Sequence, residues 1–391
     1  MDHNAAPMNQ RLWTPWFTFG VVLIAIGAVI ILYRFIAGLG AVTNLNDGFP
    51  WGVWIAFDVV TGVALAAGGF SVAALVFIFN RWEYSPLIRP ALLTALLGYA
   101  IAAIAIVIDV GRWWQIYNPV LPQYWQGNSP LFEVAICVKI YLTVMIIEFI
   151  PAISEKYKDS AKPFLRKLAN KLGPLVNKYL MIFILLGVVV STLHQSSLGA
   201  VMIAAVDRIH GLWWSPWMPL MFLISAIAVG FAVVTVESYI AARSFNRKVE
   251  SDILARLAGI IPYVLGIYLL LKLFDLIAYG KLPLLVADWW GLMYIIEMSL
   301  FVFIPIYMLR KKAVRYDIGK LLTVSIMMIA GIILNRLNTY LFTYQPRPGR
   351  TYFPTIEEIL VTAALIAVLF VGYKVLANVF PVMSVGMEKK Y

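Results

Sequence analysis

Residues 48–58 read GFPWGVWIAFD and open a long apolar segment. They place Asp58 about two helical turns inside that segment, roughly 10 Å at ~1.5 Å per residue. A carboxylate at this depth costs a few kcal/mol, roughly 2.5–3.5 on insertion scales, unless it has a partner or water. An acid inside a membrane segment is therefore a candidate functional residue, typically for protons, ions or a polar headgroup.

The composition indicates a membrane protein. Of the 391 residues, 62% are hydrophobic and 13% are charged, whereas soluble domains are about 45–50% apolar and about 25% charged. The formal charge of +11 comes largely from Lys and Arg in loops, so topology explains it and nucleic-acid binding is not indicated. The one cysteine, Cys137, lies in an apolar segment, and an iron–sulfur cluster takes about four Cys ligands.

Apolar windows of about 20 residues predict an all-α, polytopic protein with ten membrane-spanning helices in one domain, 16–379. They are expected near 16–37, 51–79, 88–110, 131–153, 178–198, 217–241, 255–279, 289–309, 320–343 and 356–379. Residues 1–15 and 380–391 form tails. The first apolar run lacks a small-residue cleavage site, so we interpret it as a retained helix. Three glycines predict close packing of the second helix: Gly62, Gly68 and Gly69.

Basic residues predict the orientation of these helices. Lys and Arg concentrate in the amino tail, the even-numbered connections and the carboxyl tail. By the positive-inside rule, both termini and these connections lie in the cytoplasm, as in a multi-pass protein of the cytoplasmic (inner) membrane. The richest set follows the fourth helix: Lys156, Lys158, Lys162, Arg166, Lys167, Lys171 and Lys178.

The opposite loops are poor in charge and rich in aromatic residues. Trp and Tyr are typical of the membrane–water interface, and aromatic residues are also favoured at the centres of protein interfaces. These loops are therefore an interfacial belt or a docking surface for an extracytoplasmic partner. The residues concerned are Trp113, Trp114, Tyr117, Tyr124, Trp125, Trp213, Trp214 and Trp217.

Five ionisable residues from four helices are expected at a similar depth near the outer face of the membrane: Asp58, Asp109, Arg112, Glu133 and His194. We interpret them as an outer polar pocket with a proton relay, or as structural ion pairs between and within helices. For Asp109 and Arg112 an i,i+3 ion pair at a helix end is the favoured interpretation, because such pairs are common.

The fourth helix carries polar residues along its whole length. Glu133, Cys137, Tyr141, Val144 and Glu148 step by three or four and so share one helical face. That face extends about 22 Å at ~1.5 Å per residue. Further polar residues lie deep in other helices: Arg89, Tyr99, Glu237, Lys272, Glu297 and Arg336.

The histidines do not indicate a haem or a metal site. Of the three, His3 lies in the amino tail and His210 in a loop, so only His194 lies inside a predicted helix. A bis-histidine haem needs two facing ligands. A His/Met haem is possible in principle, since the chain has 14 Met, but nothing places a methionine opposite His194. A His/Cys metal site is equally unsupported. His194 can instead exchange a proton near neutral pH or hydrogen-bond a quinone carbonyl. Any electrons would then come from a partner's cluster and leave on a lipid-soluble carrier.

Several blocks carry a resemblance: GLGAVTNLNDGFPWGVWIAFD (38–58), FNRWEYSPLIRPALL (79–93), IDVGRWW (108–114), LFE (131–133), LHQSSLGA (193–200) and YFPTIEE (352–358). The sequence resembles the NrfD-like (polysulfide reductase type) integral membrane subunits, above all those of hydrogenase-2-type nickel–iron hydrogenases. Residues 240–345 match mainly in hydropathy.

The resemblance implies two four-helix bundles, near 51–198 and 217–343, with flanking helices. It also implies a haem-free subunit that binds quinone near the extracytoplasmic face and exchanges electrons with a docked iron–sulfur subunit. The positions that this family uses for quinone and proton handling match Asp58, Arg89, Tyr99, Glu133 and His194.

The leading hypothesis is a subunit of a hydrogenase-2-like complex of anaerobic respiration, working with an iron–sulfur and a catalytic subunit on menaquinone or ubiquinone. The quinone would be bound by Asp58, His194, Asp109 and Arg112, and protons would move along Glu133, Tyr141, Glu148 and Glu237. The alternatives are a complex of the sulfite-reductase-linked or polysulfide-reductase type, a proton-coupled secondary transporter, and a structural anchor. Transporters often contain inverted repeats, and no clear internal repeat is visible.

Overall fold

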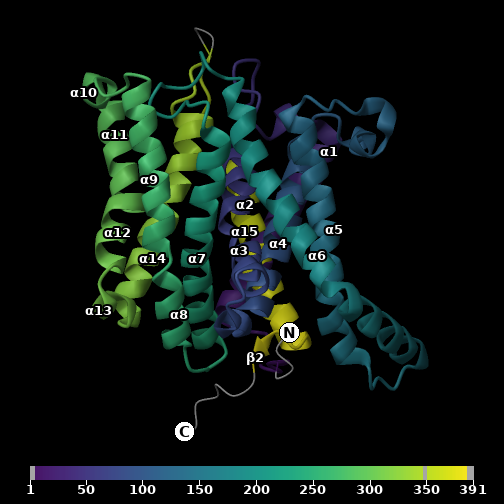
Figure 1. Ribbon diagram of the computed structural model, residues 1–391. Coiled ribbons are helices and arrows are strands. Elements are labelled where there is room, and N and C mark those ends of the chain that lie inside the picture. Colours follow the sequence, from purple (N-terminus) through teal and green to yellow (C-terminus); the bar gives the residue numbers. More distant parts are fainter. Residues whose placement is uncertain (1–4, 347–349, 385–391) are drawn as a thin grey trace.

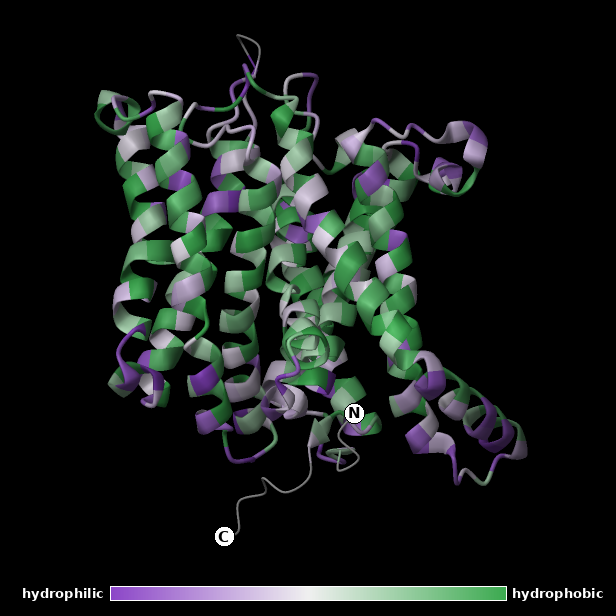
Figure 2. Cartoon of the chain, viewed as in Figure 1, coloured by the Kyte–Doolittle hydropathy of each residue, from purple (hydrophilic) through white to green (hydrophobic). Residues whose placement is uncertain are grey.

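The protein is mainly helical (Figure 1). The computed structural model describes residues 5–346 and 350–384, and within these ranges ten helices are long and apolar enough to cross a membrane. The helix bodies are mainly hydrophobic, and hydrophilic residues gather toward the two ends of the bundle (Figure 2). The predicted all-α membrane fold is therefore confirmed, and each predicted helix has a counterpart in the structure.

The ten spans consist of regular and irregular helical segments. The first six are α1 (Pro15–Ala37), η2–α2–α3–η3 (Trp54–Thr61, Gly62–Leu65, Gly68–Ala73, Ala74–Ile78), η4–α4 (Trp82–Leu87, Ile88–Asp109), α5 (Pro130–Tyr157), α6 (Pro163–Ile203) and α7 (Met218–Ser244). The last four are α8–α9 (Ser251–Ala258, Ile261–Ala278), α11–η8–α12 (Trp289–Met298, Ser299–Phe303, Ile304–Leu309), α14–η9 (Ile318–Leu337, Asn338–Phe342) and α15 (Ile356–Val379). Short helices in connections are η1 (Leu39–Ala41), η5 (Trp113–Gln115), η6 (Asn118–Val120), η7 (Pro122–Tyr124), α10 (Leu284–Ala287) and α13 (Lys312–Arg315).

Local sequence signals explain where several helices begin. Ser129 caps α5 by accepting a hydrogen bond from a backbone N–H of the first turn, with proline at the next position. Thr355 and Glu358 form a reciprocal capping box at the start of α15. These caps satisfy backbone N–H groups that a helix start otherwise leaves without partners.

Prediction and structure differ most at the fifth helix. The apolar window predicts 178–198, whereas α6 covers Pro163–Ile203. At ~1.5 Å per residue its 41 residues span about 60 Å, roughly twice the ~30 Å hydrocarbon core. The additional turns project with the end of α5 beyond the other helices (Figure 1) and are largely hydrophilic (Figure 2). An apolar window detects only the part of a helix that lies in the membrane, so it missed this extension.

The second span is irregular from its start. It begins with the π-helical segment η2 (Trp54–Thr61), which contains Asp58, and π-helical turns are frequent at functional sites. The predicted close packing is confirmed for Gly68 and Gly69, because a Cβ there would lie 2.7 Å from a valine side chain of α7 or 2.6 Å from an alanine of α4. It is wrong for Gly62, whose nearest neighbour is a carbonyl of its own span at 3.6 Å.

The two tails of the chain are paired. The strands β1 (Ala5–Ala6) and β2 (Met383–Ser384) form a two-stranded antiparallel sheet. The backbone N–H of Met8 also donates to the carbonyl of Ala377 at 3.2 Å. Both described ends of the chain therefore lie at one end of the bundle, as an even number of spans requires (Figure 1). The cytoplasmic placement of this end remains a prediction.

Neighbouring helices in space are not always neighbours in sequence. The first helix, α1, packs against the last, α15, and a Cβ on Gly27 of α1 would collide with Ala364 of α15. The α5 and α6 helices pair, and α7 contacts α3, α6, α9 and α14. The division into two four-helix bundles remains a prediction.

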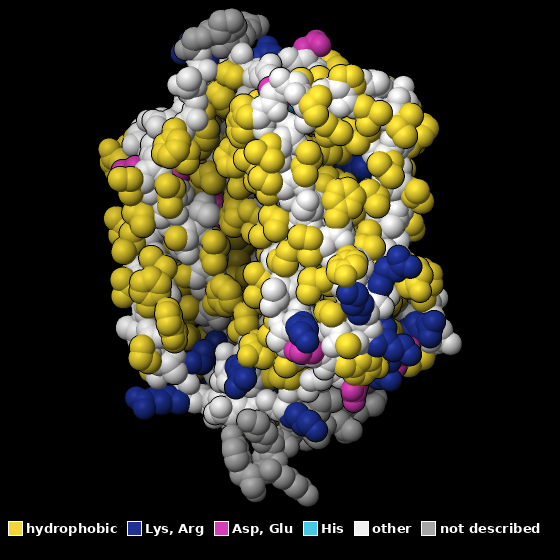
Figure 3. Space-filling view, turned by 90° about the vertical axis from the view of Figure 1, so that its left-hand side faces the viewer, with side chains coloured by type: hydrophobic (Ala, Val, Ile, Leu, Met, Phe, Trp, Pro, Cys, Tyr) yellow, Lys and Arg dark blue, Asp and Glu magenta, His cyan; other side chains and the backbone are white. Residues whose placement is uncertain are grey.

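The distribution of hydrophobic and basic side chains on the surface is typical of a membrane protein. One face of the molecule is covered by hydrophobic side chains and is hollowed along its length, while Lys and Arg gather toward the end that holds the tails (Figure 3). The basic connections therefore lie together at one end of the bundle, and the side of the membrane that this end faces remains a prediction.

Candidate functional site

His194 of α6 lies at the centre of a buried polar group. It is 0% exposed, and among the described residues neither ring nitrogen has a hydrogen-bond partner. Its ring centroid lies 5.6 Å from that of Tyr99, which in turn packs edge-to-face on Tyr141 at 4.4 Å. The Tyr99 hydroxyl shares a hydrogen bond with the Ser191 hydroxyl at 3.0 Å. We call Tyr99, Tyr141, Ser191 and His194 the tyrosine–histidine cluster.

Gln195, the residue after His194, also has a buried polar atom without a hydrogen-bond partner among the described residues. The Gln195 side chain donates from Nε2 to the carbonyl of Val63 at 3.0 Å, while its Oε1 accepts no hydrogen bond from the described part of the chain. A buried polar group without a partner costs about 1–3 kcal/mol. Two consecutive α6 residues thus hold polar atoms that a ligand can satisfy. Sequence reasoning placed neither Gln195 nor Ser191 in the site, although the LHQSSLGA block contains the glutamine.

A buried face of α5 continues from the cluster. Cys137, Tyr141, Val144 and Glu148 are all buried, as the predicted shared face requires. Tyr141 and Glu148 line a small cavity of about 10 Å³, near the lower limit for one water. A Cβ on Gly187 of α6 would lie 3.0 Å from Glu148 Oε1, so this glycine leaves room for the carboxylate.

Glu133 lies at the outer end of the same helix. It occupies the first turn of α5 and is exposed. Tyr141 follows eight residues later, about 12 Å along the axis at ~1.5 Å per residue. The structure therefore places Glu133 at the exposed end of the α5 face and not inside the cluster.

Asp58 is buried but faces a different helix. It is 4% exposed, and its Oδ2 accepts a hydrogen bond from the Thr362 hydroxyl of α15 at 2.7 Å. Sequence reasoning did not find Thr362, because its partner is 304 residues away along the chain.

The residues around Asp58 are held by an outer lock, defined here as Gly52, Tyr352 and Glu358. The Tyr352 hydroxyl donates to Glu358 Oε1 at 2.6 Å and accepts from the backbone N–H of Val53 at 2.9 Å. Burial, and then the hydrogen bond to the Glu358 carboxylate, raise the pKa of Tyr352 above its ordinary value. A Cβ on Gly52 would lie 2.9 Å from Glu358 Oε1, so only glycine leaves room for the lock.

The predicted Asp109–Arg112 ion pair is wrong. No ion pair joins these two residues in the described structure, and Arg112 is exposed. The reason is that α4 ends at Asp109, so the helical i,i+3 geometry does not reach Arg112. The end of α4 is instead capped by Arg34 of α1, whose guanidinium donates to the carbonyls of Ile108 and Val110, both at 2.6 Å.

Arg89 lies at the opposite end of α4 from Asp109. It makes two hydrogen bonds of 2.7 Å to the Glu155 carboxylate of α5 and one of 2.8 Å to the carbonyl of Pro381. Tyr99 is ten residues further along α4, about 15 Å at ~1.5 Å per residue. Arg89 therefore joins helix ends near the tails and lies away from the tyrosine–histidine cluster.

Glu237 belongs to another part of the bundle. Its Oε1 accepts a hydrogen bond from the Tyr373 hydroxyl of α15 at 3.0 Å. Glu148, in contrast, packs beside Gly187 of α6. The structure thus separates the two predicted inner members of the proton path onto different helix pairs.

A second buried polar network lies around Glu297 of α11. Its carboxylate accepts hydrogen bonds, each of 2.7 Å, from the Trp213 indole and from the amides of Asn335 and Asn338. Asn335 Oδ1 in turn accepts from the Arg336 guanidinium at 2.6 Å. Sequence reasoning noted Glu297 and Arg336 without a role, and did not find the two asparagines that connect them.

The described residues contain no group of three or more His, Cys, Asp and Glu side chains that fits a metal ion. His210, the other described histidine, lies in a loop, where its Nε2 is 3.4 Å from Asp288 Oδ2. His194 and His210 therefore do not form a facing pair of haem ligands inside the bundle.

Comparison with known proteins identifies the family. The family described as Polysulphide reductase, NrfD matches residues 41–345. The chain belongs to the NrfD family. The predicted resemblance is therefore confirmed, and this NrfD protein is an integral multi-pass membrane protein.

Three relatives of the NrfD chain bear on its role. The Probable Ni/Fe-hydrogenase 2 b-type cytochrome subunit of Escherichia coli (strain K12) is 37% identical over 388 residues, which are 98% of this chain and 96% of the relative. The Menaquinone reductase, integral membrane subunit, of Nitratidesulfovibrio vulgaris is 30% identical over 278 residues, 68% of this chain and 64% of the relative. The Hdr-like menaquinol oxidoreductase integral membrane subunit of Archaeoglobus fulgidus is 23% identical over 257 residues, 65% and 59% of the two chains.

Proposed function

We propose that this NrfD-family chain is the quinone-reactive membrane subunit of a respiratory oxidoreductase complex. It passes electrons between an extracytoplasmic iron–sulfur subunit of a hydrogenase-2-like complex and menaquinone or ubiquinone. The observation that carries the proposal is the buried, unpaired imidazole of His194 beside the Tyr99 ring. The relatives named for menaquinone and for nickel–iron hydrogenase support the substrate and the kind of complex.

The chemistry of a quinone suits these side chains. Reduction of a quinone to a hydroquinone takes two electrons and two protons, and both ring oxygens need hydrogen-bond donors. In the proposal His194 and Asp58 bind or protonate the headgroup, and the Tyr99 hydroxyl assists. Asp109 and Arg112 stand at the outer end of α4 and contribute to the entrance of the site.

Protons reach the headgroup along α5. Exposed Glu133 exchanges protons with the aqueous phase, and the buried face that carries Tyr141 and Glu148 extends the path toward the basic end. Glu237, which pairs with Tyr373 of α15, is proposed as a separate inner proton-exchanging group and does not continue the α5 face. Arg89 is a positioning residue in this scheme, because its two hydrogen bonds to Glu155 fix the inner ends of α4 and α5.

The name of one relative includes a b-type cytochrome, and the two histidines that the structure describes do not fit a bis-histidine haem. His194 has its ring against Tyr99, and the imidazole of His210 lies in a loop beside Asp288. We therefore propose that the subunit is haem-free and that its partner's iron–sulfur cluster supplies or receives the electrons.

The outer loop between α4 and α5 is the proposed docking surface for that partner. Exposed aromatic side chains, including Trp114 at 57% and Trp125 at 52%, cover it. Aromatic residues are enriched at the centres of protein interfaces. This surface lies at the same end of the bundle as Glu133 (Figure 1), which brings electron and proton entry to one side.

The test measures quinone reduction by the purified complex. We expect His194→Ala and Glu133→Gln to lower quinone-linked turnover about 100-fold or more, the usual effect of losing a proton-transferring group. Leu193→Ala is the matched control, because Leu193 precedes His194 on α6 and is 47% exposed. Reduction of a water-soluble dye by the catalytic subunit stays unchanged, which places the loss at the quinone step, and co-purification of the subunits reports assembly. Wild-type quinone turnover in His194→Ala would instead support a structural anchor.

A further inference from the structure

A large cavity lies away from the tyrosine–histidine cluster. Its volume is about 690 Å³, within the ~300–1,000 Å³ that ligand sites usually occupy. Residues of α1, α4, α7, α14 and α15 line it, so it lies where the α1–α15 pair meets the rest of the bundle. Thr94 lines it from α4, while Tyr99 is five residues further on, about 140° around the helix at ~3.6 residues per turn. The cavity and the cluster therefore face different sides of α4.

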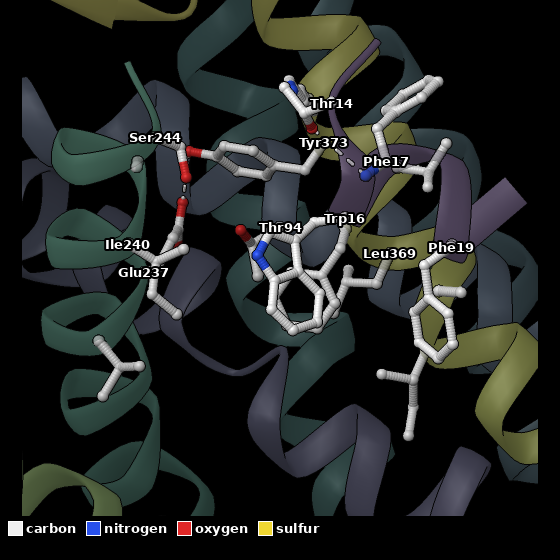
Figure 4. A pocket seen from close by; sticks show the side chains of 18 of the residues that line it. Thr14, Trp16, Phe17, Phe19, Thr94, Glu237, Ile240, Ser244, Leu369 and Tyr373 are labelled. Atoms are coloured by element: carbon white, nitrogen blue, oxygen red, sulfur yellow. Dashed lines mark hydrogen bonds between the residues drawn. The ribbon is translucent and has the colours of Figure 1, made fainter. Parts of the chain in front are cut away.

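The walls of the cavity are mainly apolar, and the polar side chains among them belong to Thr14, Thr94, Glu237, Ser244, Tyr373 and Lys374. Trp16, Phe19 and Leu369 are among the wall residues. The Tyr373 hydroxyl and Glu237 point toward one another across the cavity and share their 3.0 Å hydrogen bond there (Figure 4). The second carboxylate oxygen, Glu237 Oε2, is buried and has no hydrogen-bond partner in the described part of the chain.

The position along the helix places this carboxylate inside the membrane. Glu237 precedes the end of α7 at Ser244 by seven residues, about 10 Å at ~1.5 Å per residue, on the side of the basic connections. Exposed apolar residues such as Trp16 and Phe370 form the outer rim. A ligand that reaches Glu237 through such a rim is lipid-soluble.

The polar side chains that line the cavity indicate which kind of lipid headgroup it can bind. A carboxylate only accepts hydrogen bonds when ionised, so it repels phosphate and attracts hydroxyl groups. Lys374 also lines the cavity, and its ammonium donates to the carbonyl of Leu12 at 2.9 Å and to the hydroxyl of Thr14 at 3.2 Å. Its ammonium group therefore already has hydrogen-bond partners within the protein and is not free to bind the phosphate of an anionic phospholipid.

We propose that this cavity binds a lipid whose head is uncharged and carries a hydroxyl group, and that the hydroxyl donates to Glu237 Oε2. Given the proposed function, on which this assignment rests, the lipid is the isoprenoid hydroquinone. The cavity is thus a binding site on the inner half of the protein for the reduced carrier, separate from the tyrosine–histidine cluster. A neutral glycerolipid such as diacylglycerol has the same hydrogen-bonding chemistry.

The test is photolabelling of the purified complex in lipid nanodiscs with a menaquinol analogue that carries a diazirine in its tail and is kept reduced. Mass spectrometry of the labelled peptides locates the probe. We expect labels on α1, α7 and α15 around the cavity. Glu237→Gln keeps the shape of the side chain but leaves one acceptor oxygen where the carboxyl group has two, and we expect about tenfold less label there, the loss of one buried hydrogen bond.

Further variants keep the test independent of folding. Ala363→Phe fills the cavity from α15 and should abolish the label at all probe concentrations. Tyr33→Phe is the matched control, because Tyr33 is a 54% exposed tyrosine of α1 away from the cavity, and its label should match wild type. Undiminished labelling in Glu237→Gln would overturn the role of the carboxylate.

A diacylglycerol probe separates the two sources of ligand. Weaker labelling by diacylglycerol than by the menaquinol analogue supports the hydroquinone, whereas equal or stronger labelling overturns it. The readout is the position of a label and not turnover. If His194→Ala retained full quinone turnover while the cavity label persisted, the proposed function would fail and the binding site would stand.

Discussion

Gly52→Ala tests the outer lock that holds the start of the second span. A Cβ at this position would lie 2.9 Å from both Glu358 Oε1 and Tyr352 Cζ, so the tyrosine must move. Its hydroxyl then loses the 2.6 Å bond to Glu358 and the 2.9 Å bond from Val53. Hydrogen bonds to charged groups contribute about 1.5–3 kcal/mol and neutral ones about 0.5–1.5 kcal/mol. After a gain of about 0.4–1 kcal/mol from a stiffer unfolded chain, we expect a net loss of about 1–4 kcal/mol.

The assay is thermal unfolding of the purified protein in detergent, followed by tryptophan fluorescence. Gly40→Ala is the matched control, because a Cβ on Gly40 would meet no described atom within 4 Å. Adding Tyr352→Phe to Gly52→Ala should restore little of the lost stability, because the hydroxyl bonds are already broken. Equal melting temperatures for Gly52→Ala and Gly40→Ala would refute the reasoning.

Two further predictions concern the buried polar groups. Glu297→Ala leaves the Trp213 indole and the Asn335 and Asn338 amides without their acceptor. Each hydrogen bond inside a membrane contributes about 0.6–1.7 kcal/mol, so we expect the free energy of unfolding to fall by about 2–5 kcal/mol, which a lower melting temperature would show. Glu297→Gln should lose less stability than Glu297→Ala. Equal losses in the two variants would contradict this account. The haem-free proposal predicts that the purified subunit shows no stoichiometric b-type absorption band after reduction with dithionite, and such a band, lost in His194→Ala, would overturn it.

The sequence predicted the spans well because hydropathy is a property of one segment at a time. Every window of apolar residues became a helix, and the burial of Tyr141 and Glu148 on one face followed from their spacing. The start of α6 at Pro163 was missed because its first turns are hydrophilic and lie outside the apolar window. The Asp109–Arg112 pair failed because α4 ends at Asp109, one residue before the predicted end at 110, and Arg112 lies in the connection that follows.

Lateral contacts were beyond the reach of the sequence. Depth can be counted along a helix, so Asp58 and His194 were both expected near the outer side, but depth does not say which helix stands opposite. Asp58 meets Thr362 of α15, whereas His194 meets Tyr99 of α4. The asparagines around Glu297 were missed for the same reason, since an amide becomes a partner only when two distant helices pack.

The pairing of the first helix with the last has a consequence for biosynthesis. The residues between Ala37 and Ile356 must be made before α15 exists to cover α1. At roughly 5–20 residues per second, α1 waits about 15–65 s in the bilayer with Gly27 and its neighbours facing lipid. A ribosome that stalls anywhere in this interval leaves the α1 surface around Gly27 uncovered, and we expect a membrane protease to be able to distinguish such an unfinished chain from a finished one.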